Sequence, residues 1–82
     1  KGVIMKFPNE TELYQVIGSN IKYYREQAGL TQIQLSEQVK ISISYLSKIE
    51  ASGCSKSLSI SVLNHIANML DVDITEFFQR RN

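Results

Sequence analysis

The chain carries a signal for the start of a helix at several points along its length. Asn9 is followed three residues later by Glu12, and Thr31 is followed by Gln34. This spacing is typical of a capping box, in which the two side chains bind each other's backbone N–H groups. The stretch D-I-T-E, which begins at Asp73, has the same form. Repeated caps of this kind predict an all-α chain built from short helices.

Apolar residues follow these caps at helical spacing. The first helix is expected over residues 10–28, and Gly29 behind it is a usual left-handed stop. A second helix of about two turns follows Thr31, a fourth begins near Leu58, and a fifth follows Asp73. With the third helix described next, these predict a compact bundle of five helices. The positions expected to face inward on the first, second and fourth helices are Leu13, Ile17, Ile21, Tyr24, Ala28, Leu35, Val39, Leu63, Ile66, Ala67 and Leu70.

The stretch KISISYLSKIE in the middle of the chain allows two interpretations. As a strand over residues 40–45, it would place Ile41, Ile43 and Tyr45 on one face. Against the strand, Ser42 is a good N-cap, and Leu46 and Ile49 follow it at helical spacing. We therefore expect a third helix over residues 43–51, with Ile43 partly exposed at the flank of its first turn.

Length and composition restrict the other functions that the chain could have. Eighty-two residues support one core, and the single cysteine, Cys54, excludes an internal disulfide. Cys54 and the one histidine, His65, cannot supply the four ligands of a structural zinc site, so we expect an incidental thiol and an exposed imidazole. No apolar run approaches the roughly 20 residues of a membrane span. We expect a cytoplasmic domain without metal or cofactor. We also expect no enzymatic activity, since nothing is placed to activate a serine nucleophile.

The segment from Leu30 to Glu50, LTQIQLSEQVKISISYLSKIE, resembles the helix-turn-helix of the lambda-repressor-like proteins, the Cro-type or XRE family. In this family five helices pack together, and the second and third form the part that binds DNA. The resemblance covers about residues 17–78. Two short helices that cross steeply share one small wedge of core, so large side chains fit only where they face inward. The matching positions are the apolar Leu35, Val39, Ile41, Leu46 and Ile49 and the small Ser36.

The sequence departs from the family pattern at two places. The tight turn between the two helices usually carries glycine, which tolerates a positive φ, and here it carries Lys40. Lys40 therefore allows a strained or slightly different turn. After the third helix, residues 51–58 are ASGCSKSL, where the family often ends its loop with Pro-Ser-Leu. The resemblance leaves the conformation of this loop open.

The resemblance implies which side chains would contact the bases of DNA. A helix in the major groove uses residues near its N-terminus for this purpose. Ile43 could touch a thymine methyl group, or it could merely cover the edge of the core. Lys48 could donate to guanine or meet a phosphate. The positions that match the family's base-reading residues are Ser42, Ile43, Ser44, Ser47 and Lys48.

Phosphate contacts and one ion pair are implied in the same way. Gln32 resembles the family glutamine that clamps a backbone phosphate, and it lies at a helix N-terminus, which favours anions. Arg25 and Glu50 match a pair that forms a partly buried salt bridge in several family members, and Arg25 would also lie near the phosphates. The expected phosphate-binding residues are Gln32, Lys22, Tyr23, Arg25, Tyr45 and Lys56.

We expect a homodimer, because a single short helix contacts too few bases for tight specificity. Of Phe77 and Phe78, one would fill the core and the other could meet its twin across the dimer axis, together with Ile74. The alternative is that both phenylalanines belong to the core.

The chain is expected to divide into three parts: an N-terminal arm over residues 1–9, a helix-turn-helix domain over residues 10–79 and a C-terminal tail over residues 80–82.

These features predict a sequence-specific regulator of transcription that binds double-stranded DNA as a homodimer at an inverted repeat. The alternative is a protein-interaction module, such as an antitoxin that neutralises a protein partner. Its best support is the net charge of only +1, because phosphate neutralisation supplies much of the affinity of DNA-binding proteins. The two classes differ in whether Gln32, Lys48, Lys56, Lys22 and Arg25 form one positive face, with the acids Glu37, Asp71 and Asp73 elsewhere.

Overall fold

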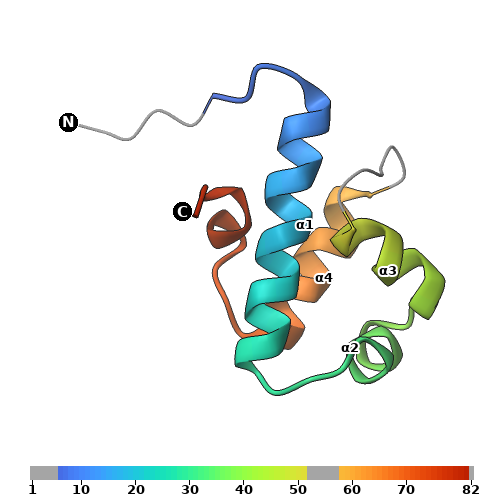
Figure 1. Cartoon of the computed structure of the whole chain (residues 1–82). Helices are drawn as coiled ribbons and strands as arrows, with labels where there is room; N and C mark the ends of the chain where they lie inside the picture. Colours follow the sequence, from blue (N-terminus) through green and yellow to red (C-terminus); the bar gives the residue numbers. More distant parts are fainter. Residues whose placement is uncertain (1–5, 52–57, 82) are drawn as a thin grey trace.

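The computed structural model describes residues 6–51 and 58–81. Over these residues the chain forms four α-helices and a short C-terminal 3-10 helix, and no strand; Figure 1 shows their arrangement. The predicted all-α class is confirmed. None of the described helices combines the length and the apolar composition needed to cross a membrane. The elements are α1 Glu10–Gln27, α2 Gln32–Val39, α3 Ile43–Glu50, α4 Ile60–Leu70 and η1 Ile74–Phe78.

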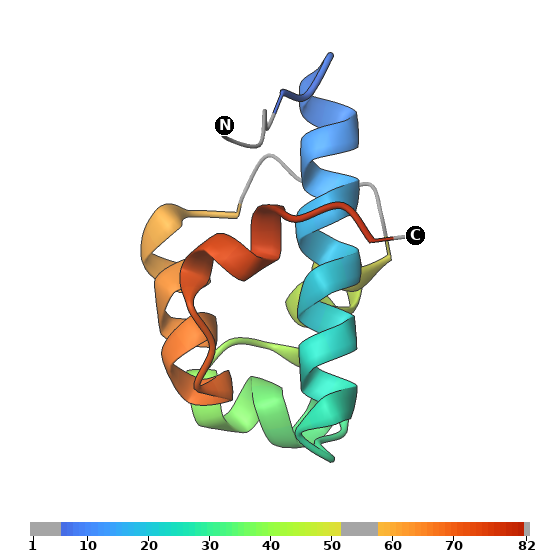
Figure 2. The same ribbon diagram turned by 90° about the vertical axis from the view of Figure 1, so that its left-hand side faces the viewer.

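Helix α1 runs through the middle of the bundle. In Figure 1, α2 and α3 lie on one side of it and η1 lies on the other, and Figure 2 shows η1 in front when the molecule is viewed from that second side. Helix α1 contacts α3, α4 and η1, while α2 contacts α3 and α4. The apolar faces of all five elements meet in one core. Its buried residues are Ile17, Ile21, Leu35, Val39, Leu46, Ile49, Leu63, Ile66, Ala67, Leu70 and Phe77.

Side-chain caps start the α-helices. At α2 the predicted capping box is closed: the Gln34 N–H donates to the Thr31 hydroxyl at 3.1 Å, and the Thr31 N–H donates to the Gln34 side-chain oxygen at 2.8 Å. Asn9 caps α1 by accepting from a backbone N–H three residues on, at 2.9 Å. Ser59 caps α4. Helix α4 therefore begins at Ile60, two residues after the start expected near Leu58.

The last element is a 3-10 helix of five residues and not the expected fifth α-helix. The Asp73 carboxylate accepts hydrogen bonds from the backbone N–H and the hydroxyl of Thr75, only two residues on, at 3.0 and 2.7 Å. These hydrogen bonds hold the pKa of Asp73 below its usual range. Glu76, which would complete the capping box with Asp73, accepts instead from the Tyr24 hydroxyl of α1 at 2.9 Å. Burial, and then this hydrogen bond, raise the pKa of Tyr24.

Three helices end on a residue in the left-handed conformation. Gly29 follows α1 with a φ of 74°, Lys40 follows α2 with 66°, and Asp71 follows α4 with 57°. In each case the next N–H bonds to the carbonyl five residues earlier, as in a Schellman motif. Lys40 therefore makes the turn that the family resemblance assigns to glycine. The residues that follow the three left-handed positions are all apolar and pack against the core: Leu30, Ile41 and Val72.

The crossing of α1 and α3 depends on the absence of a side chain at Gly18. A Cβ atom at this position would overlap the backbone carbonyl oxygen of Ile49 in α3. Glycine in a helix interior is unfavourable for the helix itself. Here it allows two backbones to approach more closely than any other residue would permit.

A buried asparagine binds the C-terminal segment to α1. Asn20 is fully buried, and its amide nitrogen donates to the backbone carbonyls of Phe77 and Gln79 at 2.9 and 2.7 Å. Its amide oxygen accepts from Arg81 at 2.6 Å. The Arg81 guanidinium also lies 4.1 Å from the centre of the Tyr23 ring. Arg81, which the sequence assigns to the tail, is therefore bound to α1.

Burial decides one open expectation and corrects two others. Phe77 is fully buried in the core, so it is not available to a second protomer, whereas Phe78 is half-buried at its edge. Ala28 is exposed because α1 ends one residue before it. His65 is half-buried and not exposed, since it lies next to the buried Ile66 on α4. Cys54 lies outside the described residues.

Replacing Gly18 with alanine is expected to lower the free energy of unfolding by about 1–3 kcal/mol, the usual cost of overpacking. Urea denaturation followed by circular dichroism measures this change. Ser19→Ala, on the exposed side of the same helix, is the matched control and should change stability by less than about 0.5 kcal/mol. A Gly18→Ala protein as stable as the wild type would contradict the close approach of α1 and α3.

Replacing Lys40 with glycine is expected to stabilise the domain by roughly 0.5–1 kcal/mol. The left-handed conformation costs a residue with a side chain about 1–2 kcal/mol, and the extra freedom of glycine in the unfolded chain takes back about half of that gain. Glu37→Gly, at an exposed position inside α2, should instead destabilise by about 1 kcal/mol. Thermal and urea denaturation of both variants test this difference in sign, and a loss of stability in Lys40→Gly would count against it.

Candidate nucleic-acid interface

Helix α3 presents one side to the core and the other to solvent. Leu46 and Ile49 are buried. Ser42 caps the helix by accepting from the Tyr45 N–H at 3.0 Å. Ile43, in the first turn, is 44% exposed, as the helical interpretation of this stretch predicts. The outward side, called the α3 face below, consists of the exposed Ser42, Ile43, Ser44 and Lys48 and the half-buried Ser47.

A bidentate ion pair joins α1 to the end of α3. Arg25 Nε and Nη2 donate to the two carboxylate oxygens of Glu50 at 2.8 and 2.9 Å, and Nη1 donates to the Leu30 carbonyl at 2.8 Å. The side chains of Arg25 and Glu50 are only 9% and 2% exposed. The hydrogen bonds to Glu50 raise the pKa of Arg25. The ion pair that the family resemblance implies is present, and it is largely shielded from water.

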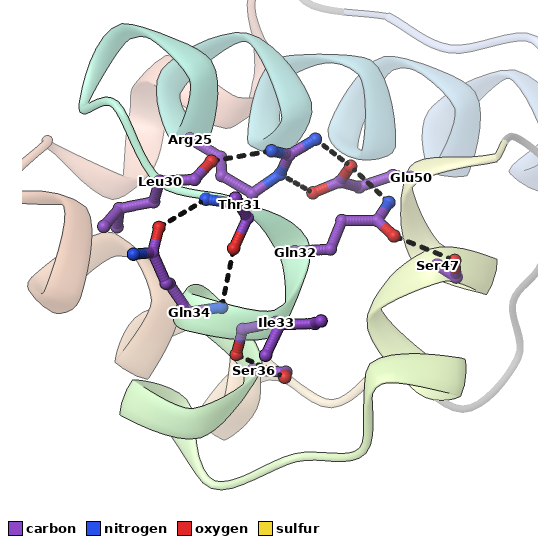
Figure 3. Close-up of polar contacts among 9 residues, drawn as sticks. All are labelled: Arg25, Leu30, Thr31, Gln32, Ile33, Gln34, Ser36, Ser47 and Glu50. Atoms are coloured by element: carbon purple, nitrogen blue, oxygen red, sulfur yellow. Dashed lines mark hydrogen bonds and ion pairs between the residues drawn. The ribbon is translucent and has the colours of Figure 1, made fainter.

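Gln32 extends this ion pair to the α3 face. Its Nε2 donates to Glu50 Oε1 at 3.0 Å, and its Oε1 accepts from the Ser47 hydroxyl at 3.1 Å. Figure 3 shows Gln32 between the two, reaching from the first turn of α2 towards α3. These contacts hold Gln32 in a single orientation beside α3. The connected residues, called the polar network below, are Arg25, Glu50, Gln32 and Ser47.

Lys22 and Tyr23 are adjacent on α1 but point in different directions. Lys22 is exposed and lies one helical turn after Gly18, so it shares the side of α1 that meets α3. Tyr23 is 40% exposed, but its ring packs against Arg81 of the C-terminal segment. Since that segment lies on the other side of α1 (Figure 1), Tyr23 is not brought together with α3.

The other expected phosphate contacts also differ in their surroundings. Arg25 is 7% exposed and donates from all three guanidinium nitrogens within the protein, so its environment fits the structural role and not the phosphate role. Tyr45 is half-buried and packs against the core. Lys56 lies outside the described residues. Of the cations expected on one positive face, Lys22 and Lys48 are exposed, while the Arg25 charge is compensated inside the fold.

Two features of this region do not emerge from the sequence analysis. Gly18 could have been noticed, because an isolated glycine inside a helical pattern often marks a close approach of backbones. The hydrogen bonds that join Gln32 to Ser47 and Glu50 had no local signal. These residues lie 15 and 18 positions apart in the chain, and only the packing of α2 against α3 brings them together.

A family model of the helix-turn-helix matches residues 21–77, which is well over half of the chain. The chain belongs to the XRE-type helix-turn-helix family. The resemblance drawn from the sequence is therefore confirmed. In this helix-turn-helix domain, α2 and α3 are the two helices, and the left-handed Lys40 lies in the turn between them.

Known proteins with similar sequences and structures agree with this assignment. The HTH-type transcriptional regulator SlrR of Bacillus subtilis (strain 168) is 38% identical over 63 residues, which make up 77% of this chain but only 41% of SlrR. The crystal structure of SinR, the master regulator for biofilm formation, in complex with DNA has a TM-score of 0.70 at 33% identity, covering 77% of this chain and 98% of that chain. ClgR, the clp gene regulator from Corynebacterium glutamicum, shares the fold with a TM-score of 0.73 at 24% identity, over 80% of this chain and 82% of its own.

Removing the Glu50 carboxylate is expected to destabilise the helix-turn-helix domain by about 3–5 kcal/mol, because Glu50→Ala leaves the Arg25 charge buried and unpaired. Glu12→Ala is the matched control. The Arg80–Glu12 pair is just as short, at 2.7 Å, but its side chains are 41% and 37% exposed, and such surface pairs contribute about 0–1 kcal/mol. Urea denaturation compares the two variants.

The double variant Arg25→Met, Glu50→Met should recover much of the loss, because it leaves no charge in the buried site. Equal losses in Glu50→Ala and Glu12→Ala would contradict a shielded ion pair.

Proposed function

We propose that this chain is the sequence-specific DNA-binding domain of a transcriptional regulator that acts as a homodimer on an inverted repeat. Helix α3 would enter the major groove, and α2 would cross the phosphate backbone beside it. The observation that carries the proposal is the α3 face, which stays accessible while Leu46 and Ile49 on the opposite side of the helix are buried in the core. The likeness to SinR, whose structure was solved with DNA, supports it.

The α3 face offers both apolar and polar contacts to bases. Ile43 lies in the first turn, where a major-groove helix meets base edges, and its exposed side chain suits a thymine methyl group. Ser42 and Ser44 flank it with hydroxyl groups. Lys48, one turn further along, can donate to guanine N7 and O6 or to a phosphate.

The phosphate contacts would come from the start of α2 and from lysines. The capping box uses the N–H groups of Thr31 and Gln34, which leaves those of Gln32 and Ile33 without partners inside the helix and available to an anion. Lys22 adds a charge from the side of α1 that meets α3. Phosphate contacts fix the position of the protein on the duplex and carry no sequence information of their own.

The homodimer follows from the small size of the α3 face. Two protomers on an inverted repeat would place their recognition helices about 34 Å apart, one turn of DNA. Because Phe77 is buried, the proposed C-terminal interface is reduced to Ile74 and Phe78, which are both half-buried. An interface of this size favours dimer formation on the DNA more than in free solution.

The second candidate function is a protein-interaction module, and it draws on the charge of the chain. Net charge is +1, and the Arg25 charge is compensated by Glu50 within the fold. Phosphate attraction would therefore be modest. If the chain does bind DNA, contacts to the bases must therefore supply a large share of its affinity.

Selection from random duplex DNA at moderate salt is expected to recover an inverted repeat. Ile43→Ala should then lose preference for thymine at one position of each half-site, by roughly 1–3 kcal/mol. If Lys48 contacts a phosphate, Lys48→Ala should weaken binding to all sequences alike and reduce the slope of log affinity against log salt by about 1 per protomer. If Lys48 contacts a base, its variant should instead lose a guanine preference.

Two variants provide matched controls for these measurements. Met69→Ala removes an apolar side chain of similar exposure, 42%, from α4, and Lys6→Ala removes a lysine that precedes α1. Neither should alter base preference. If the wild-type chain enriches no sequence above scrambled DNA, the DNA-binding proposal fails, and a protein partner becomes the function to pursue.

A further inference from the structure

Ser47 has a hydroxyl group whose proton is already bound within the protein. It donates to Gln32 Oε1 at 3.1 Å. Ser47 is half-buried and lies one helical turn after Ile43, so its accessible side belongs to the same surface. A serine hydroxyl has one proton to donate and two lone pairs that accept. What Ser47 can offer to DNA is therefore determined by the polar network behind it.

Glu50 determines which groups donate and which accept hydrogen bonds in that network. Its carboxylate is paired with the Arg25 guanidinium at 2.8 and 2.9 Å and is 2% exposed. A carboxylate in such an ion pair is ionised and can only accept hydrogen bonds. Any neutral group that faces Glu50 Oε1 must therefore be a donor.

The amide of Gln32 obeys this requirement. Its Nε2 faces Glu50 Oε1 at 3.0 Å. If the amide were rotated by 180°, its oxygen would face the carboxylate with no proton between them, and a hydrogen bond to a charged group would be lost. The amide is thus held with its nitrogen towards Glu50 and its oxygen towards Ser47. Figure 3 shows this orientation, in which Ser47 has to be the donor.

We propose that Ser47 contacts DNA only as a hydrogen-bond acceptor and selects a base with an amino group at its major-groove edge. Adenine N6 and cytosine N4 are such groups. Guanine O6 and N7 and thymine O4 only accept, so they find no proton at Ser47. Ser44, on the same face but outside the polar network, has a hydroxyl that can rotate and is not restricted in this way. The inference rests on the proposed function and adds a base preference to it.

The test measures affinity for all four bases at each position of the DNA half-site recovered by selection. Ser47→Ala should abolish the preference at one position, where the wild-type chain favours adenine or cytosine by about tenfold. Gln32→Leu releases the Ser47 proton. Guanine or thymine should then gain at that same position, and the preference should fall to about twofold. Gln38→Leu removes an exposed glutamine of α2 outside the polar network, and should leave the tenfold preference intact.

Circular dichroism and thermal denaturation establish that each variant is folded, and Gln32→Met replaces Gln32→Leu if that variant is not. The inference is overturned if Ser47→Ala changes no position, if the position that it changes favours guanine or thymine in the wild type, or if a folded Gln32 variant keeps the full preference. In each of these cases the wild-type chain still selects a DNA sequence, so the proposed function stands. If the wild type selects no sequence, the proposed function and the inference fail together.

Discussion

The ion pair between Arg25 and Glu50 joins α1 to α3, and further hydrogen bonds from both residues reach the start of α2. Arg25 lies in α1 and also holds the Leu30 carbonyl at the approach to α2, while Glu50 closes α3 and binds Gln32 in the first turn of α2. Buried ion pairs stabilise a fold little in net terms, because desolvation offsets the attraction. Their contribution here is orientation: the three helices must keep one arrangement for all of these donors and acceptors to find partners.

Backbone geometry determines how closely the helices pack against one another in this arrangement. Gly18 lets α3 lie against α1 with no side chain between them. The left-handed residues at the ends of α1, α2 and α4 turn the chain sharply, and an apolar residue after each turn returns it to the core. Lys40 occupies one of these positions in spite of its side chain, which shows that packing on both sides of the turn outweighs the local conformational cost.

In the proposed function, the resulting surface would favour specificity more than general attraction to DNA. One arginine charge is used inside the fold, and the exposed α3 face carries three serines near one isoleucine and one lysine. Contacts of this kind depend on direction, so they need a rigid support. The polar network supplies that support for Ser47 by fixing Gln32, and it thereby connects a structural ion pair to the chemistry that a base would meet.

The sequence by itself determined the helices, their order, the family and the accessible face of α3, because caps and apolar spacing act between residues about four positions apart. It did not determine that the last element would be a 3-10 helix, that Phe77 would be buried, or that Tyr23 would face the C-terminal segment. Those outcomes, like the pairing of Gln32 with Ser47, depend on which helices meet. Only the tertiary structure decided them. A polar or aromatic side chain on a helix surface forms a specific hydrogen bond or ring contact only when the packing of the helices brings a partner within reach.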